Sequence, residues 1–196
     1  MTTNSNKNTS PTYCVTGVVR GSFVKVFQPT VNEETGKGEY SMTLLILKAD
    51  TETLAKIKAA CKAAIDKHFN GKPPEGLNVP WHDGDGPKPQ GGMYGEECKG
   101  HWVINTKTTQ QPTVVDAQVQ RILDPTAFVS GDYCRVALNA YAYSNKRKGV
   151  AVGLGNIQVV RKGEPLGNKR AAEDDFEAFA DASAPVGVAG GDDPWG

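Results

Sequence analysis

The segment CVTGVVRGSFVKVF, residues 14–27, indicates the fold class more clearly than any other part of the chain. It is dense in β-branched and aromatic residues, which favour strands. Gly17 and Gly21 interrupt it, and a glycine inside a strand marks a bulge or a tight bend. Small barrels need such bends at their corners, so the segment predicts one long, bent strand of a small β-barrel.

The next part of the chain predicts a hairpin and then a helix. Residues 39–48, EYSMTLLILK, have strand character and pair with the first strand across a mobile, glycine-containing loop. Asp50 is the expected N-cap of a helix over residues 51–69. Apolar side chains at helical spacing predict the face that packs on the core. This stripe comprises Leu54, Ile57, Cys61, Ala64, Ile65 and, at its edge, His68.

The remaining pattern predicts a long loop and four further strands. Residues 71–100 are rich in Gly and Pro and have no clear periodicity, as in a long functional or mobile loop. The strands are expected over residues 101–106, 114–123, 132–143 and 150–161. The predicted fold class is mainly β with one principal helix, an OB-fold-like small Greek-key barrel. The helix follows the second strand rather than the third, so the match to the OB-fold order is loose.

Charge divides the chain into a basic body and an acidic tail. Residues 1–170 carry all 22 Lys and Arg against 15 Asp and Glu, a formal charge of +7, whereas residues 171–196 carry seven acidic residues and no basic one. We expect a disordered arm over residues 1–12, an OB-type domain over 13–168 and a disordered acidic tail over 169–196. The basic body indicates a polyanionic partner.

The tail ends in residues that suit a docking role. It can fold back on a basic groove in place of a polyanion, or present its terminal aromatic ring to the pocket of a partner protein. The alternative is a tail that only keeps the protein in solution. An exposed indole argues against this alternative, because an exposed apolar ring promotes association. The expected partner-binding residues are Asp192, Asp193, Pro194 and Trp195.

Metal and catalytic motifs are weak in this chain. Cys14, Cys61, Cys98 and Cys134 are scattered without metal-ligand spacing, so we expect reduced thiols, several of them buried. The cluster WHDGDG, residues 81–86, is either a divalent-metal site or, in our preferred interpretation, an Asp-Gly turn that orients its tryptophan. No nucleophile elbow, P-loop or zinc-protease motif occurs. We therefore predict no catalytic residue, metal or cofactor. The sequence has no run of 18 apolar residues, so we also predict no membrane span.

Aromatic and basic residues occur together at several points. Tyr141 and Tyr143 share one face of a strand and precede the basic turn that begins at Lys146. Rings beside cations suit a sequence-tolerant binder of single strands, although a solvated hairpin tip with core tyrosines is the alternative. The strand at residues 20–27 mixes rings and cations in a similar way. The complete predicted DNA-binding set is Arg20, Phe23, Lys25, Phe27, Trp81, Trp102, Lys107, Tyr141, Tyr143, Lys146, Arg147 and Lys148.

Six segments, in order over most of the chain, resemble a phage and prophage family once described as a domain of unknown function. They are GVVRGSFVKVFQP (17–29), GEYSMTLLILKADTETLAKIKAA (38–60), VPWHDGD (79–85), GHWVINTKT (100–108), DPTAFVSGDYCRVALNAYAY (124–143) and GVAVGLGNIQVVRKGEPLG (149–167). The resemblance implies a single-stranded-DNA-binding protein with an OB-type core. It also implies a place in phage replication or recombination, in the cytoplasm of the bacterial host. The tail resembles those of bacterial and phage single-strand binders, but it ends in Trp-Gly rather than Pro-Phe.

Three functions follow from these observations. The leading hypothesis is a non-enzymatic, sequence-tolerant protein that coats single strands and recruits replication or recombination proteins through its tail. The first alternative is a recombination mediator that anneals complementary strands. The second is a metal-dependent nuclease built on His82, Asp83, Asp85 and His101. The sequence leaves the oligomeric state and the partner of the tail open.

Overall fold

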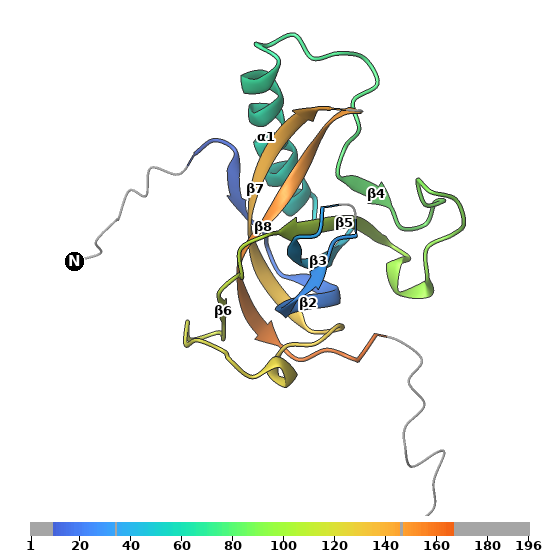
Figure 1. Ribbon diagram of the computed structural model, residues 1–196. Helices are drawn as coiled ribbons and strands as arrows, with labels where there is room; N and C mark the ends of the chain where they lie inside the picture. The colour runs from blue at the N-terminus through green and yellow to red at the C-terminus, as the bar shows by residue number, and fades with distance from the viewer. Residues whose placement is uncertain (1–9, 34, 146, 167–196) are drawn as a thin grey trace, which may run out of the picture. The chain divides into compact units, whose positions relative to one another are not determined.

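The computed structural model describes residues 10–33, 35–145 and 147–166. Strands predominate in this part of the chain, and one long helix, α1, lies among them (Figure 1). The strands are β1 Tyr13–Val15, β2 Val19–Val31, β3 Gly38–Leu47, β4 Trp81–Asp83, β5 His101–Thr108, β6 Val114–Val115, β7 Tyr133–Ser144 and β8 Lys148–Arg161. The helices are α1 Thr51–His68 and the short 3₁₀ turns η1 Glu96–Cys98 and η2 Pro125–Ala127.

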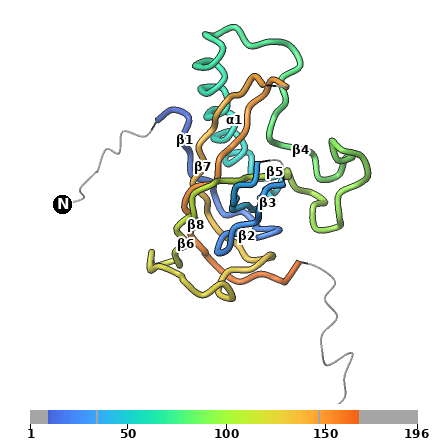
Figure 2. The backbone as a smooth tube through the Cα atoms, viewed as in Figure 1, coloured from blue at the N-terminus to red at the C-terminus, as the bar shows by residue number. Residues whose placement is uncertain are grey.

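The strands close into a barrel. β2 pairs with β3, β3 with β5, β5 with β8, β8 with β7, and β7 with β2 again. All these pairs are antiparallel except β5 and β8. A closed circuit of this kind is the OB-fold arrangement, and α1 follows its second strand, as predicted (Figure 2). The predicted fold class is confirmed for the described residues.

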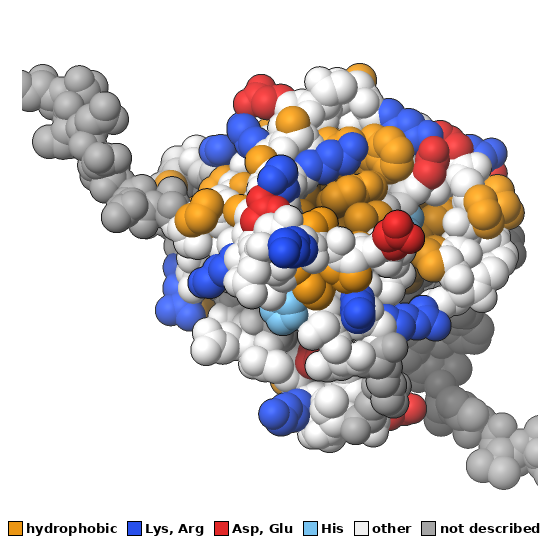
Figure 3. All heavy atoms as spheres, turned by 90° about the horizontal axis from the view of Figure 1, so that it is seen from above, with side chains coloured by type: hydrophobic (Ala, Val, Ile, Leu, Met, Phe, Trp, Pro, Cys, Tyr) orange, Lys and Arg blue, Asp and Glu red, His pale blue; other side chains and the backbone are white. Residues whose placement is uncertain are grey.

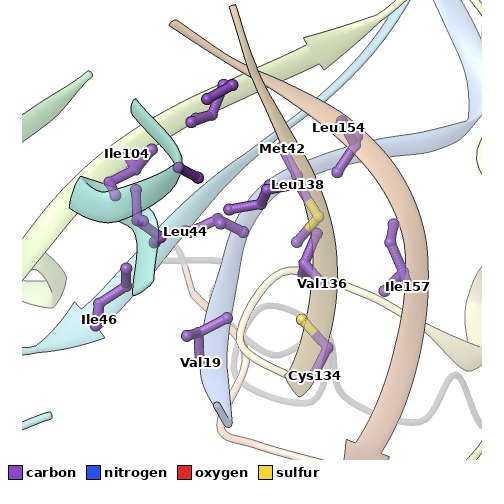
Figure 4. Close-up of a cluster of buried hydrophobic side chains, with 14 of the residues drawn as sticks. Val19, Met42, Leu44, Ile46, Ile104, Cys134, Val136, Leu138, Leu154 and Ile157 are labelled. Atoms are coloured by element: carbon purple, nitrogen blue, oxygen red, sulfur yellow. The ribbon is translucent and has the colours of Figure 1, made fainter. Parts of the chain in front are cut away.

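The barrel core is built by strand alternation. Side chains at every second position of β3 and β7 point inward, and the inward residues of the five barrel strands meet in one cluster (Figure 4). Its labelled members are Val19, Met42, Leu44, Ile46, Ile104, Cys134, Val136, Leu138, Leu154 and Ile157.

Helix α1 begins and packs as the sequence predicts. The Asp50 side chain accepts a hydrogen bond from the Thr53 amide at 3.0 Å, which caps the first turn. Ile57, Cys61 and Ala64 are buried, and α1 contacts β1, β7 and β8. His68 is exposed in the last turn, where its Nε2 lies 3.2 Å from Ser144 Oγ.

The four cysteines are free, and three of them are buried. Burial raises the pKa of the Cys61 and Cys134 thiols to about 12, so both stay protonated at neutral pH.

The first strand was predicted wrongly as one continuous element. The chain leaves strand geometry after Val15 because the Gly17 amide donates to Thr53 Oγ1 of α1 at 2.9 Å. A Cβ at Gly17 would lie 2.6 Å from that hydroxyl, so the close approach requires glycine. β1 pairs with β7, and β2 starts separately at Val19.

Two other predicted elements differ from the structure. The strand expected over residues 114–123 is only Val114–Val115, because Asp116 turns the chain by accepting hydrogen bonds from the amides of Gln118 and Gln120. The loop expected over residues 71–100 contains β4, which pairs with β5. Neither difference alters the barrel.

Most of the predicted N-terminal arm and all of the predicted acidic tail, residues 169–196, lie outside the described residues. A compact unit ends at Leu166. Within the described part of the chain, no helix is long and apolar enough to cross a membrane.

Candidate nucleic-acid interface

The outer face of β3, β5, β8 and β7 forms a continuous surface. Registers place Ser41 opposite Lys107, Lys107 opposite Gly153, and Gly153 opposite Asn139. These residues alternate with inward-facing core residues, so they all point to the outside of the barrel. We call this surface the four-strand face. β3 and β5 are the second and third strands of the barrel, where OB-folds bind oligonucleotides.

A groove of about 330 Å³ lies on the four-strand face. Tyr141 forms one wall with 43% of its surface exposed, and Ala151 lies opposite it in the register of β7 and β8. Thr43 Oγ1 donates to Asn105 Oδ1 at 2.8 Å, which leaves the Asn105 amino group as a donor. The groove therefore offers a ring and hydrogen-bond donors side by side.

A second groove, of about 720 Å³, adjoins the first at Asn105. Tyr143 and Arg147 contribute from the β7–β8 hairpin. A Cβ at Gly149 would lie 2.6 Å from the Tyr143 hydroxyl, so a glycine is needed beneath this ring. The other lining residues are Leu77, Asn78, Val79, His82, Lys88, Pro89, Gln90 and Tyr94. Burial lowers the pKa of His82, which favours its neutral form at pH 7.

One carboxylate, that of Glu39, lies beside the positive charge of the first groove. Lys107 Nζ lies 3.2 Å from both carboxylate oxygens of Glu39. Hydrogen bonds from Asn32 and Lys107 lower the pKa of Glu39, so the carboxylate is ionised at neutral pH. The cation of Lys107 is thus partly neutralised before any ligand arrives.

The structure brings together a subset of the predicted DNA-binding residues. Those that line the two grooves are Lys107, Tyr141, Tyr143 and Arg147. Lys148 is exposed at the start of β8, next to this set. Lys146 lies outside the described residues.

The two predicted tryptophans lie elsewhere. Trp81 and Trp102 are partly buried against the main core, on the inward side of the sheet. The ammonium groups of Lys58 and Lys48 lie 5.4 and 5.5 Å from the respective ring centroids. Trp81 and Trp102 therefore do not lie on the four-strand face.

The aromatic and basic residues of β2 also separate from this face. Phe23 is 66% exposed at a positive φ of 48°, and the β2–β3 register shifts on both sides of Lys25. Lys25 and Phe27 line a different cleft, which β2 forms with residues 125–130. Arg20 Nη2 donates to the Glu164 carbonyl at 2.7 Å. Strand alternation across residues 20–27 therefore did not predict which side of the sheet each of these side chains faces.

The cluster at residues 81–86 is an Asp-Gly turn. Lys48 Nζ lies 2.6 Å from both Asp83 Oδ1 and Asp85 Oδ2, and these hydrogen bonds lower the pKa of both carboxyl groups. The Gly86 amide donates to the Asp83 carbonyl at 3.1 Å and closes the turn. His101 Nδ1 lies 2.7 Å from the Lys99 carbonyl. The described residues contain no group of three or more His, Cys, Asp or Glu that could hold a metal ion.

Sequence reasoning missed the polar side chains of β3 and β5. Ser41 and Thr43 of β3 and Asn105 of β5 line the first groove. Lys88 and Tyr94, which line the second groove from the loop after β4, were missed as well. The signal was present in β3 and β5, where small polar residues alternate with buried ones in YSMTLL and VINTK. Polar positions at period 2 mark the solvent side of a strand.

The space-filling view shows one face on which basic groups predominate. Lys and Arg side chains border an area of exposed hydrophobic side chains there, with several Asp and Glu side chains interspersed (Figure 3).

A family model described as "Enterobacter phage Enc34, ssDNA-binding protein" matches residues 12–185. The chain belongs to this family. Putative protein p50 of Acyrthosiphon pisum secondary endosymbiont phage 1 is 27% identical over 171 residues, which are 81% of this chain and 89% of that protein. The family predicted from sequence is thereby confirmed.

Solved structures share the fold of this Enc34-family chain. The single-stranded DNA-binding protein of bacteriophage Enc34, in complex with ssDNA, has a TM-score of 0.67 at 23% identity, over 79% of this chain and 89% of that one. The single-stranded DNA-binding protein gp2.5 of bacteriophage T7 has a TM-score of 0.54 at 13% identity, over 81% and 96%.

Proposed function

We propose that the chain binds single-stranded DNA with little sequence preference along the four-strand face. The proposal rests on one observation: the exposed ring of Tyr141 and the half-buried ring of Tyr143 meet hydrogen-bond donors and cations on the surface where OB-folds bind oligonucleotides. Each base has a π-face that a tyrosine ring can stack on, whatever the sequence. Lys107 and Arg147 supply charge for the phosphates. The ssDNA complex of the Enc34 protein supports the same ligand class.

We also propose a non-enzymatic role in phage replication or recombination, inside the infected bacterial cell. The acidic tail, with Asp192, Asp193, Pro194 and Trp195 at its end, recruits a protein partner in this account. Its charge pattern and terminal ring are the support, since the tail lies outside the described residues.

One incubation separates the three functions. Full-length protein is mixed with labelled single strands, alone or with their complement, with and without Mg²⁺ or Mn²⁺. We expect retention of intact single strands that does not depend on the metal. Faster pairing of complementary strands would indicate annealing, and metal-dependent cleavage would overturn the non-enzymatic role. Absence of retention in every condition would overturn DNA binding itself.

A further inference from the structure

The ribbon formed by β7 and β8 lacks acidic side chains along the whole length of both strands. Its strands read YCRVALNAYAYS and KGVAVGLGNIQVVR, without a single Asp or Glu. Cys134, Val136 and Leu138 are buried, so the residues between them in β7 face outward. The two grooves involve only the end of the ribbon near the hairpin tip. The other end has no role in the function proposed so far.

A row of cation, ring and cation crosses three strands at that other end. The register places Tyr133 of β7 between Arg20 of β2 and Arg161 of β8. The guanidinium carbon of Arg161 lies 3.5 Å from the Tyr133 ring centroid, and that of Arg20 lies 5.8 Å away. Arg20 is held further by the Gly131 carbonyl, to which its Nε donates at 3.1 Å. The row is therefore fixed before any ligand arrives.

Stacking leaves the donors of Arg161 available. A guanidinium that lies flat on a ring still directs its N–H groups outward in its own plane, where they suit two phosphate oxygens at once. Arg161 is exposed, and Arg135 is a second exposed cation on the outer side of β7. The neighbouring carboxylate of Asp132 is buried and pairs with Lys162 at 3.0 Å. Its charge is thus already compensated.

We infer that Arg161, stacked on Tyr133 and backed by Arg20 and Arg135, is a second anchoring point for the phosphate backbone of the bound strand. The inference rests on the proposed function and extends it to the length of DNA engaged. Tyr133 and Tyr141 lie on one strand, separated by roughly 26 Å at about 3.3 Å per residue. A short oligonucleotide fills the four-strand face alone, whereas a longer one follows the acid-free ribbon to Arg161.

The test compares two DNA lengths in the full-length protein. Arg161→Gln is titrated with oligo-dT of about 6 and about 16 nucleotides, which span the range of site sizes for one OB-fold. We expect affinity for the longer strand to fall about threefold to tenfold at low salt, with a salt slope smaller by about 0.7. Affinity for the shorter strand should not change. Arg135→Gln, a second variant on the same face, should show the same dependence on length.

Lys62→Gln is the matched control, because it removes one positive charge from a side chain on α1 that is 76% exposed. It should bind both lengths as the wild type does. Thermal unfolding of each variant excludes a general loss of structure. Wild-type affinity of Arg161→Gln for both lengths, or an equal loss at both, would overturn the second anchoring point. Failure of the wild type to bind either length would instead overturn the proposed function.

Discussion

Tyr141 is the residue on which the proposed binding mode depends most. Its ring is exposed, yet it stands on β7, which pairs with β1, β2 and β8, and it is flanked by the small residues Ala151 and Gly153. A Cβ at Gly153 would lie 3.8 Å from the ring, so nothing bulky competes with a base for its face. A rigid platform loses little entropy when a base stacks on it.

Tyr141→Ala should weaken binding of single strands by about 1–3 kcal/mol, the usual contribution of one stacked base. The dependence on salt should stay the same, because no charge is lost. Fluorescence anisotropy with labelled oligo-dT at several salt concentrations measures both quantities.

Phe23→Ala provides the comparison, since it removes a ring that is 66% exposed but lies on β2, away from the four-strand face. This variant should bind single strands with wild-type affinity. A loss of affinity with Phe23→Ala and none with Tyr141→Ala would move the binding surface from the four-strand face to β2.

Glu39→Gln should tighten binding about twofold to fivefold at low salt and steepen the salt slope by up to about 0.7. The reason is that the variant frees Lys107 from a carboxylate 3.2 Å away. The pKa of Glu39 is lowered from the ordinary value for a glutamate, about 4.3. The carboxylate is therefore charged at neutral pH and is neutralised only when the pH falls below that ordinary value. The wild type and the variant should therefore differ throughout the neutral range. Equal salt slopes at pH 7 would contradict a role of Lys107 at the phosphates.

At the scale of the elements, the β7–β8 hairpin tip supplies charge without supporting the core. Replacing Lys146, Arg147 and Lys148 together by Ala should reduce the salt slope by up to about 2 and leave the fold intact. Salt titrations and thermal unfolding measure the two effects. Replacing Lys56, Lys62 and Lys72 by Ala removes the same charge from and just beyond α1, and this control should leave the slope unchanged. Equal slopes for all three proteins would remove the hairpin tip from the interface.

The sequence predicts those elements whose cause is local. Asp50 caps a helix whose apolar stripe has helical spacing, and both features lie within a few residues of each other. The break after Val15 depends instead on Thr53 Oγ1, a group that is distant in the sequence. β4 forms only because β5 offers it an edge. Local propensity carries no information about either contact.

The candidate site was predicted in part for the same reason. Tyr141, Tyr143 and the basic turn are neighbours in sequence, so alternation along one strand was enough to group them. The side of the sheet on which Trp81 and Trp102 lie depends on which side forms the core. Which side of the sheet packs on the core is determined by contacts among all the barrel strands. The sequence of a single strand therefore does not predict it.

At the scale of the whole molecule, the opposed charges of body and tail predict autoinhibition. Deleting residues 171–196 removes seven acidic residues from a chain whose first 170 residues carry a formal charge of +7. The truncated protein should bind single strands more tightly at low salt, and the gain should shrink as salt rises. Titrations of both proteins over the same salt range measure this. Identical low-salt affinities would contradict competition between tail and DNA.

Trp195→Ala separates recruitment from DNA binding. The change removes a neutral ring, so DNA affinity should stay close to that of the wild type. Capture of the replication or recombination partner from infected cells should be lost, as with the tail deletion. A variant that still captures the same polymerase or recombinase as the wild type would contradict docking through this ring.

We propose that the four-strand face binds single strands through their bases and phosphates. The most direct test of this proposal is a titration of labelled oligo-dT and of a duplex of equal length with full-length protein at several salt concentrations. We expect tighter binding of the single strand, with log affinity falling linearly by about 0.7 per phosphate contact for each unit of log salt. Equal affinity for the duplex, or an affinity that does not change with salt, would contradict the proposal.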